Sequence, residues 1–325
     1  MAKLLAFLLL IVLLAAAGVG YYAYRPMSLP STPFEFSLKQ GSSLKSAARQ
    51  MQQAQLLEHD APFVLLARSL GKSGQIKAGN YELNHPVSPL ELLEIITKGE
   101  VSQSQMAVIE GWTFRQLRAS LDANPDIAHD TVNLSDAEIM QRIGATETHP
   151  EGLFFPDTYY FAAGSSDLQI FKRAYQTMQK RLQEAWLGRA PGLPLQSPYQ
   201  ALTLASIVEK ETGTPGDRPM IAGVFVNRLR KGMLLQTDPA VIYGLGEKFD
   251  GNLRKNDLLA DTAYNTYTRA GLTPTPIALP GMAALQAALH PAQTDALYFV
   301  ARGDGSSQFS STLNEHNNAV NRYQK

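Results

Sequence analysis

The stretch SPYQALTLASIVEKET, residues 197–212, decides the fold of the larger part of this sequence. Apolar residues recur in it at helical spacing, which predicts a helix that ends before a break at Gly213. The apolar stripe consists of Ala201, Leu202, Leu204, Ala205, Ile207 and Val208. The polar positions of the same stretch indicate the helix face that is exposed to solvent: Thr203, Ser206 and Lys210.

Two glutamates, Glu209 and Glu211, lie near the end of this helix. At about 100° per residue they are about 200° apart, so they cannot act as a pair in one site. Both fall on the flanks of the apolar stripe, but Glu211 lies nearer to Gly213, where a cleft can open. A carboxyl beside apolar residues has a raised pKa, which suits a general acid. The alternative is a solvated carboxylate, which is common near helix ends.

Two polar and aromatic clusters follow: LQTDP at residues 235–239 and TAYNTYT at residues 262–268. The amides of Gln236 and Asn265 suit the hydroxyl and N-acetyl groups of a sugar. Other interpretations stay open, because Asp238 fits an ordinary turn, and Tyr264 and Tyr267 fit the hydrophobic core, where tyrosines are common.

Composition excludes several classes of protein. The 325 residues carry 29 basic and 29 acidic side chains, so there is no excess of positive charge to attract nucleic acid. Without cysteine, the chain has no disulfide, no thiol nucleophile and no cysteine-ligated zinc. It lacks the GxxxxGK[ST], GxGxxG, HExxH and GxSxG patterns, and its six histidines are scattered. We therefore expect no cofactor and no metal, and carboxylates remain as the candidate catalytic groups.

The N-terminus predicts a membrane anchor over residues 1–24. An uninterrupted apolar run over residues 4–20 follows Lys3, and tyrosines typical of a membrane interface come next. A cleavable signal peptide is the alternative, because Ala15 and Ala17 offer a processing site. In both cases the remainder of the chain is exported. Three prolines within residues 25–33 predict an extended tether.

The rest of the chain predicts an α+β fold in two parts. Residues 34–100 form a small α+β unit, and residues 101–325 form a mainly helical domain with a small β portion. Strands are expected at residues 34–38, 78–83, 106–109 and in a hairpin over 297–312. Helices are expected at residues 43–54, 62–70, 89–98, 114–124, from 135 on, 167–186, 197–212, 219–230 and 282–289. The aromatic segment EGLFFPDTYYF, residues 151–161, fits either ordinary packing or a site.

Several motifs, in fixed order, resemble the endolytic murein transglycosylase family, the YceG-like proteins. They are EGLFFPDTYYF, ASIVEKET, FVNRL, LQTDPAVIYGLG, AYNTYTRAGLTPTPI, HPA, LYFVA and NEHNNAV. The resemblance covers essentially the whole chain, and its least similar part is residues 34–100.

The resemblance implies a single-pass inner-membrane protein, anchored by residues 4–24, with its catalytic part in the periplasm. It implies a LysM-like peptidoglycan-binding subdomain at residues 34–100 and a lysozyme-like catalytic domain at residues 101–325. The family's catalytic glutamate matches Glu211. The implied enzyme is a lyase that cuts the β-1,4 bond between N-acetylmuramic acid and N-acetylglucosamine, leaves 1,6-anhydro ends and terminates glycan elongation, with peptidoglycan synthases as possible partners.

Five residues are the candidates for the substrate-binding surroundings of the catalytic glutamate: Gln236, Tyr264, Asn265, Asp238 and Glu209. Two competing functions remain. One is a hydrolytic muramidase that uses Glu211 with Asp238 and water, since ordinary glycosidases need two carboxylates. The other is a non-catalytic scaffold that binds the cell wall through residues 34–100.

Overall fold

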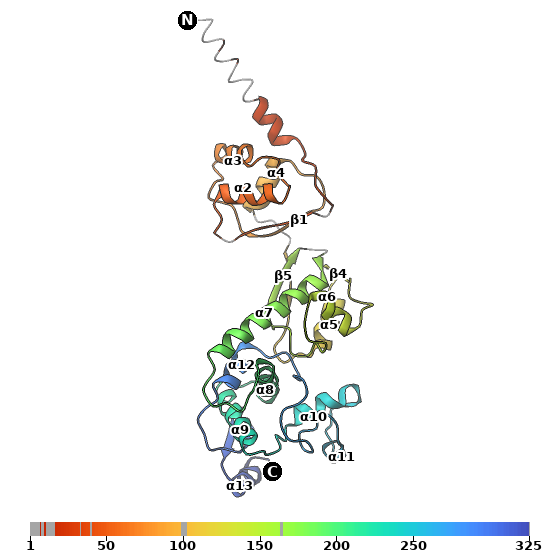
Figure 1. Ribbon diagram of the computed structural model, residues 1–325, viewed down its shortest axis with the longest axis vertical. Helices are drawn as coiled ribbons and strands as arrows, with labels where there is room; N and C mark the ends of the chain where they lie inside the picture. The colour runs from red at the N-terminus through yellow and green to blue at the C-terminus, as the bar shows by residue number, and fades with distance from the viewer. Residues whose placement is uncertain are drawn as a thin grey trace. The chain divides into compact units, whose positions relative to one another are not determined.

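The computed structural model describes Phe7, Leu10 and residues 17–32, 34–39, 41–98, 103–162 and 165–324. The chain has a mixed α/β fold and divides into two compact units (Figure 1). The N-terminal unit comprises Met1–Gln105 with Tyr160–Gly164, and the C-terminal unit comprises Met106–Tyr159 with Ser165–Lys325.

After the helical residues 17–24, the described part of the N-terminal unit combines a two-stranded sheet with three helices. Its elements are β1 (Phe34–Leu38), α2 (Leu44–Gln53), α3 (Asp60–Ser69), β2 (Gly79–Leu83) and α4 (Pro89–Lys98). β1 and β2 are antiparallel, with Phe36 opposite Tyr81. The alternation of FEFSL predicted β1 correctly, and the Ser43 hydroxyl caps α2 by accepting from the Ser46 N–H.

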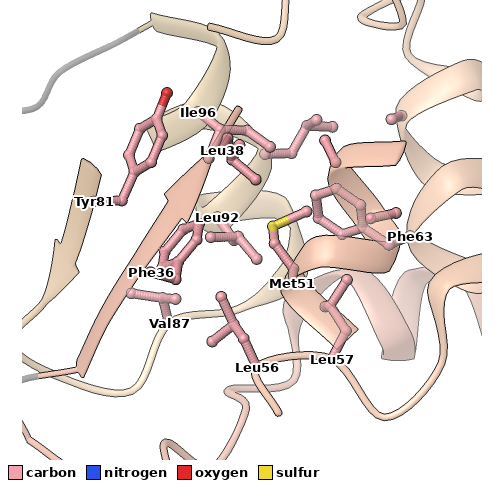
Figure 2. Close-up of a cluster of buried hydrophobic side chains, with 14 of the residues drawn as sticks. Phe36, Leu38, Met51, Leu56, Leu57, Phe63, Tyr81, Val87, Leu92 and Ile96 are labelled. Atoms are coloured by element: carbon pink, nitrogen blue, oxygen red, sulfur yellow. The ribbon is translucent and has the colours of Figure 1, made fainter. Parts of the chain in front are cut away.

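The sheet and the helices of this unit enclose one hydrophobic cluster, which Figure 2 shows. The rings of Phe36 and Tyr81 stack with centroids 5.2 Å apart. Met51 of α2 and Leu92 of α4 are fully buried against the same cluster. The apolar stripes of the helices and the inward face of β1 thus meet in a single core.

The segment that precedes β1 packs against this core. Ala23 is buried, and Met27 and Leu29 lie against the cluster, while the Met27 N–H donates to the Val87 carbonyl at 2.9 Å. Part of the predicted tether is therefore irregular chain held to the unit. Most of the predicted anchor, residues 1–24, lies outside the described residues. Among the residues that are described, no helix has both the length and the apolar character needed to span a membrane.

The C-terminal unit is mainly helical. Its elements are α5 (Phe114–Asp122), β4 (Ile127–Ala128), α6 (Asp136–Ile143), β6 (Ser165–Ser166), α7 (Asp167–Leu187), α8 (Pro198–Glu211), α9 (Arg218–Arg230), α10 (Asp238–Leu245), the 3₁₀ helix η1 (Gly246–Lys248), α11 (Lys255–Leu259), α12 (Met282–Leu289), β7 (Tyr298–Ala301), β8 (Ser307–Ser310) and α13 (Leu313–Tyr323). β4 and β6 are parallel, and β7 and β8 form the predicted antiparallel hairpin. β3 (Gln103–Ala107) pairs with β5 (Thr158–Ala162), and the division of the chain passes through both strands.

Helix α8 lies at the centre of the C-terminal unit, where α7, α9, α10 and α12 all contact it (Figure 1). Every residue from Ala201 to Val208 is buried, so the prediction that Thr203 and Ser206 face solvent is wrong. Their hydroxyls bond the backbone instead: Thr203 donates to the Tyr199 carbonyl at 2.9 Å, and Ser206 accepts from the Ile277 N–H at 3.0 Å. A hydroxyl satisfied in this way is compatible with burial.

Residues that typically cap helices predicted where several helices begin. Thr113 and Ser135 form capping boxes at the starts of α5 and α6, and Ser166 caps α7. The sequence analysis did not predict α10, α11 and α13, which have at most 11 residues each. Length alone does not explain these omissions, because α6 and α12 have eight residues each and were predicted.

The aromatic segment at residues 151–161 is mostly core. Phe154 is fully buried, and its ring lies 5.1 Å from that of Phe114 and 5.6 Å from that of Phe171. Gly152 has φ +80°, and a β-carbon there would lie 2.3 Å from Cβ of Pro276. Glycine is therefore required on both backbone and steric grounds.

Candidate active site

Glu211 is the last residue of α8. Its Oε1 accepts a hydrogen bond of 2.5 Å from the hydroxyl of Thr237. The pKa of Glu211 is raised to about 7, chiefly by burial; the hydrogen bond from Thr237 opposes this rise, and the charge of Asp238 adds to it. Near neutral pH this carboxyl can therefore both give and take a proton.

The two polar clusters of the sequence come together beside Glu211. The Thr237 N–H donates to the Thr266 hydroxyl at 3.0 Å, and the Gln236 N–H donates to the Thr266 carbonyl at 3.1 Å. The hydroxyl of Tyr267 donates to Oδ1 of Asp238 at 2.5 Å. The segment at residues 262–268 thus fixes the segment at residues 235–239 from which Thr237 reaches Glu211.

Asp238 and Pro239 begin helix α10, and Thr237 is the N-cap residue before it. The sequence analysis allowed a simple turn here, although a threonine followed by aspartate and proline is a typical helix start. Because Asp238 opens the helix, its position is set by the helix backbone and by Tyr267. Its side chain is exposed, next in sequence to the residue that bonds Glu211.

Arg228 of α9, in the FVNRL motif, supports the same segment through hydrogen bonds. It is buried, and its guanidinium donates to the Leu234 carbonyl at 2.9 Å, the Leu235 carbonyl at 3.2 Å and Oε1 of Gln236 at 3.0 Å. Gln236 itself is exposed and has φ +52°, an uncommon conformation for a residue with a side chain. The sequence analysis did not single out Arg228.

Glu209 has a different environment from Glu211. Its carboxylate accepts from the Arg218 guanidinium at 3.3 Å and from the Gly281 N–H at 2.9 Å, and its side chain is 5% exposed. Burial raises its pKa, and the bonds from Gly281 and Arg218 oppose this. Glu209 therefore joins the starts of α9 and α12 to α8, whereas Glu211 has no ion pair among the described residues.

Asn265 and Tyr264 hold the loop before α12. Asn265 is fully buried, and its amide donates to the carbonyls of Leu258 and Ala260 at 3.1 and 2.6 Å. These bonds occupy its amide hydrogens inside the protein. Tyr264 is partly exposed, its hydroxyl lies 2.9 Å from that of Thr275, and its ring meets that of Tyr243 edge to face at 4.9 Å.

Glu151 is a second buried carboxyl, and the sequence analysis did not propose a role for it. It is 3% exposed and accepts from the Phe114 N–H at 2.9 Å and the Tyr243 hydroxyl at 3.1 Å. Burial raises its pKa to about 7, and both hydrogen bonds oppose the rise. Tyr243 is 92 residues away in sequence, so no local signal points to this pair. Helix α10 therefore reaches Glu211 through Thr237, just before its first residue, and Glu151 through Tyr243.

Asp122, His129 and Asp167 are the one group of described residues whose ligand atoms lie close enough together for a metal ion, all within 4.8 Å of one another. The carboxylate of Asp167 already accepts from the Asp130 N–H, the Thr131 N–H and the Thr131 hydroxyl. These donors compensate the negative charge of Asp167. We therefore assign Asp167 a structural role, which is to hold the loop before α6.

Comparison with known proteins gives a consistent result. A sequence model of the YceG-like family matches residues 36–322. A protein of Bacillus subtilis named endolytic murein transglycosylase is 33% identical over 309 residues, which covers 90% of this chain and 85% of that relative. A protein of Streptococcus pneumoniae with the same name is 27% identical over 359 residues; the match covers 98% of this chain but 64% of the longer streptococcal protein.

A solved structure agrees with the sequence matches. The crystal structure of a YceG-like protein from Listeria monocytogenes superposes with a TM-score of 0.55 at 28% identity. The match covers 87% of this chain and 97% of the listerial chain. On the sequence match over nearly its whole length and on this structural similarity, the chain belongs to the YceG-like family.

Proposed function

We propose that this protein is an endolytic lytic transglycosylase, a lyase that cleaves the glycan strands of peptidoglycan, with Glu211 as its catalytic residue. The proposal depends on the surroundings and the pKa of one carboxyl, that of Glu211. Glu211 is bonded by the Thr237 hydroxyl, has no ion pair among the described residues and has a pKa of about 7. The names of the relatives from Bacillus subtilis and Streptococcus pneumoniae support the choice of substrate.

The proposed reaction needs one proton carrier. Protonated Glu211 gives its proton to the oxygen between N-acetylmuramic acid and N-acetylglucosamine as the bond from that oxygen to the muramyl C1 breaks. The muramyl N-acetyl group supports the positive charge that develops on C1. Ionised Glu211 then takes the proton of the muramyl C6 hydroxyl, whose oxygen bonds to C1 and closes a 1,6-anhydro ring. Glu211 ends the cycle protonated, and no water is consumed.

The neighbours of Glu211 suit both halves of this cycle. The negative charge of Asp238 raises the pKa of Glu211, which favours the proton donor of the first step. The Thr237 hydroxyl stabilises the carboxylate that forms when the proton leaves. General acid and base catalysis of this kind contributes roughly 10²–10⁴ in rate.

Asp238 also supports a second candidate, the hydrolytic muramidase. Its exposed carboxylate lies next in sequence to Thr237, so it could activate a water that attacks C1. We favour the lytic reaction because Asp238 already accepts a hydrogen bond from Tyr267 and acts on Glu211 through its charge. The products distinguish the two, since an anhydro end is lighter than a hydrolysed end by one water.

We assign sugar contacts to the exposed Gln236 and the partly exposed Tyr264. Asn265, a candidate sugar contact from the sequence, is buried with its amide hydrogens bonded to backbone carbonyls, and we assign it to the support of the loop. Glu209 similarly supports the helix ends through Arg218 and Gly281.

The cellular setting is also part of the proposal. Residues 1–24 anchor the chain in the inner membrane, and the catalytic domain at residues 101–325 works in the periplasm. Residues 34–100 form a LysM-like subdomain that binds peptidoglycan. Cleavage within nascent strands would terminate their elongation beside the synthases. The apolar run at residues 4–20 and the family of the chain support this assignment.

The test is digestion of purified glycan strands followed by mass analysis of the ends. Wild type should give 1,6-anhydro ends, and Glu211→Gln should keep its fold and lose cleavage. Glu209→Gln is the matched comparison on the same helix, assayed below its own melting temperature because it loses the charge that pairs with Arg218. Full activity of Glu211→Gln together with loss of activity in a folded Glu209→Gln would show that the wrong carboxyl had been chosen.

A further inference from the structure

Gln236 lies between a buried guanidinium and solvent. Nη1 of Arg228 donates to Oε1 of Gln236 at 3.0 Å, and Nε of Arg228 donates to the Leu297 carbonyl at 2.7 Å. Arg228 is 7% exposed, whereas Gln236 is an exposed residue. The amide of Gln236 therefore has one end tied to the protein and the other end available.

The chemistry of arginine fixes which end of the amide is tied. A guanidinium has donors only, so it accepts no hydrogen bond from an amide nitrogen. The oxygen of Gln236 must face Arg228, and the NH₂ group must point away from it. In the part of the chain that the structure describes, Nε2 of Gln236 has no hydrogen-bond partner. The two N–H donors of the Gln236 amide are therefore exposed and have a defined direction.

The backbone holds this arrangement in place. Gln236 has φ +52°, in the left-handed region that residues other than glycine seldom adopt. Its N–H donates to the Thr266 carbonyl, and the next residue, Thr237, bonds both Thr266 and Glu211. Such conformations persist where the surroundings over-determine them, often at functional sites.

We propose, on the basis of the function proposed above, that Gln236 binds an acetamido oxygen of the glycan through its Nε2 amide, and that Arg228 is the positioning residue that fixes this polarity. An acetamido carbonyl only accepts hydrogen bonds, so it matches a donor-only group. The ammonium of a de-N-acetylated sugar only donates and is mismatched. The enzyme is therefore selective for N-acetylated strands at the sugar that Gln236 touches.

Binding to an inactive variant separates recognition from chemistry. We would titrate Glu211→Gln with N-acetylated glycan strands and with the same strands after chemical de-N-acetylation. One hydrogen bond contributes on the order of 1 kcal/mol, so the acetylated strands should bind about five- to tenfold more tightly. In the double variant Glu211→Gln/Gln236→Glu, a carboxylate oxygen replaces the NH₂ group, and the preference should disappear or reverse toward the ammonium-bearing strands.

A second pair of variants tests the positioning role. Arg228→Lys keeps a positive charge, but all its donors lie on one nitrogen, so it cannot reproduce the separate bonds of Nε to the Leu297 carbonyl and of Nη1 to Gln236. In the Glu211→Gln background it should lose the preference while it still binds glycan. Arg230→Lys is the matched control, because Arg230 lies at the end of the same helix, is exposed and donates to the Gly192 carbonyl at 3.1 Å. It should keep the preference.

The outcomes separate the two proposals. An unchanged preference in the Gln236→Glu variant, or equal binding of the two strands by Glu211→Gln, overturns the role of Gln236 while cleavage by wild type leaves the proposed function standing. Loss of preference in both arginine variants would remove Arg228 as the positioning residue. If wild type cuts neither strand and Glu211→Gln binds neither, the proposed function fails and this inference fails with it. A misfolded Arg228→Lys, recognised by its melting temperature, leaves the Gln236→Glu comparison to decide.

Discussion

The hydroxyl of Thr237 reaches Oε1 of Glu211 at 2.5 Å across 26 residues of sequence. The residue after Thr237, Asp238, acts on the same carboxyl in the opposite sense. The hydrogen bond lowers the pKa of Glu211, whereas the negative charge of Asp238 raises it. Two adjacent residues at the start of α10 thus adjust the acidity that burial has set, and single substitutions can test each contribution.

Thr237→Val should move the alkaline limb of the pH–activity profile upward. Valine removes the donor that stabilises ionised Glu211, so the pKa of Glu211 rises and the acid form persists to higher pH. A hydrogen bond of about 1 kcal/mol corresponds to roughly 0.7 pH unit. The measurement is the rate of release of anhydro ends between pH 5 and 9. Thr237→Ser keeps a hydroxyl and should leave the limb in place; a shift as large as that of valine would contradict this account.

Asp238→Asn should move the same limb downward. The substitution removes the charge that raises the pKa of Glu211, and the amide oxygen can still accept from Tyr267. Less Glu211 is then protonated at neutral pH, and activity falls there while activity at pH 5 is retained. The muramidase mechanism predicts a different result, with loss of activity at every pH because Asp238 would be the base that activates water.

Glu151 should make the stability of the fold depend on pH. Its carboxyl has an ordinary pKa of 4.5 when unfolded and about 7 when folded, so the folded state binds more protons between these values. Stability is therefore highest below pH 4.5 and falls as the pH rises to 7, by about 3 kcal/mol for this group. Glu151→Gln does not titrate, so its stability relative to wild type should improve as the pH rises. Urea unfolding at pH 5 and pH 8 measures the difference.

Tyr243→Phe should have the opposite effect on that dependence. Phenylalanine removes the hydrogen bond that lowers the pKa of Glu151, so the carboxyl is still less stable as an anion. The loss of stability relative to wild type should be small at pH 5 and larger, by about 1 kcal/mol, at pH 8. An equal loss at both pH values would mean that the Tyr243 hydroxyl stabilises the ionised and the protonated forms of Glu151 equally.

Gly152→Ala should destabilise the C-terminal unit far more than Gly144→Ala. The two glycines have nearly the same φ, +80° at Gly152 and +79° at Gly144. An alanine in this region costs about 1 kcal/mol at either position. At Gly152 the new carbon would also lie 2.3 Å from Cβ of Pro276, whereas nothing lies within 4 Å at Gly144. We expect about 1–3 kcal/mol more for Gly152→Ala, measured by denaturant unfolding; equal losses would show that Pro276 moves aside freely.

Most helices and strands followed from local signals. Alternation in FEFSL predicted β1, and capping residues such as Ser43, Thr113 and Ser135 marked helix starts that the structure has. Caps and periodic patterns act within a few residues, so they can be recognised in the linear chain. Helix α10 and the placement of Thr237 were not predicted, because the segment around Asp238 also fits an ordinary turn.

The candidate site was predicted in part. The sequence indicated the segments around Glu211, Gln236 and Asp238, and the structure brings these segments together. It gave no reason to choose between Glu209 and Glu211 from helix geometry, since both lie on the flanks of one stripe. The choice depends on Arg218 and Gly281, which occupy Glu209 alone. Asn265 was misjudged because an amide that binds sugar and an amide that caps a helix end look the same in a sequence.

Local order and family membership could be recognised in the amino-acid sequence, because caps, periodicity and ordered motifs depend on residues close together in the chain. The acidity of Glu211 and the orientation of the Gln236 amide could not be recognised in the sequence. The pKa of Glu211 depends on how much water the folded protein removes and on Thr237 and Asp238, and the direction of the Gln236 amide depends on Arg228. Burial and hydrogen bonds between distant segments exist only once the chain has packed, and they give two similar glutamates of one helix different surroundings.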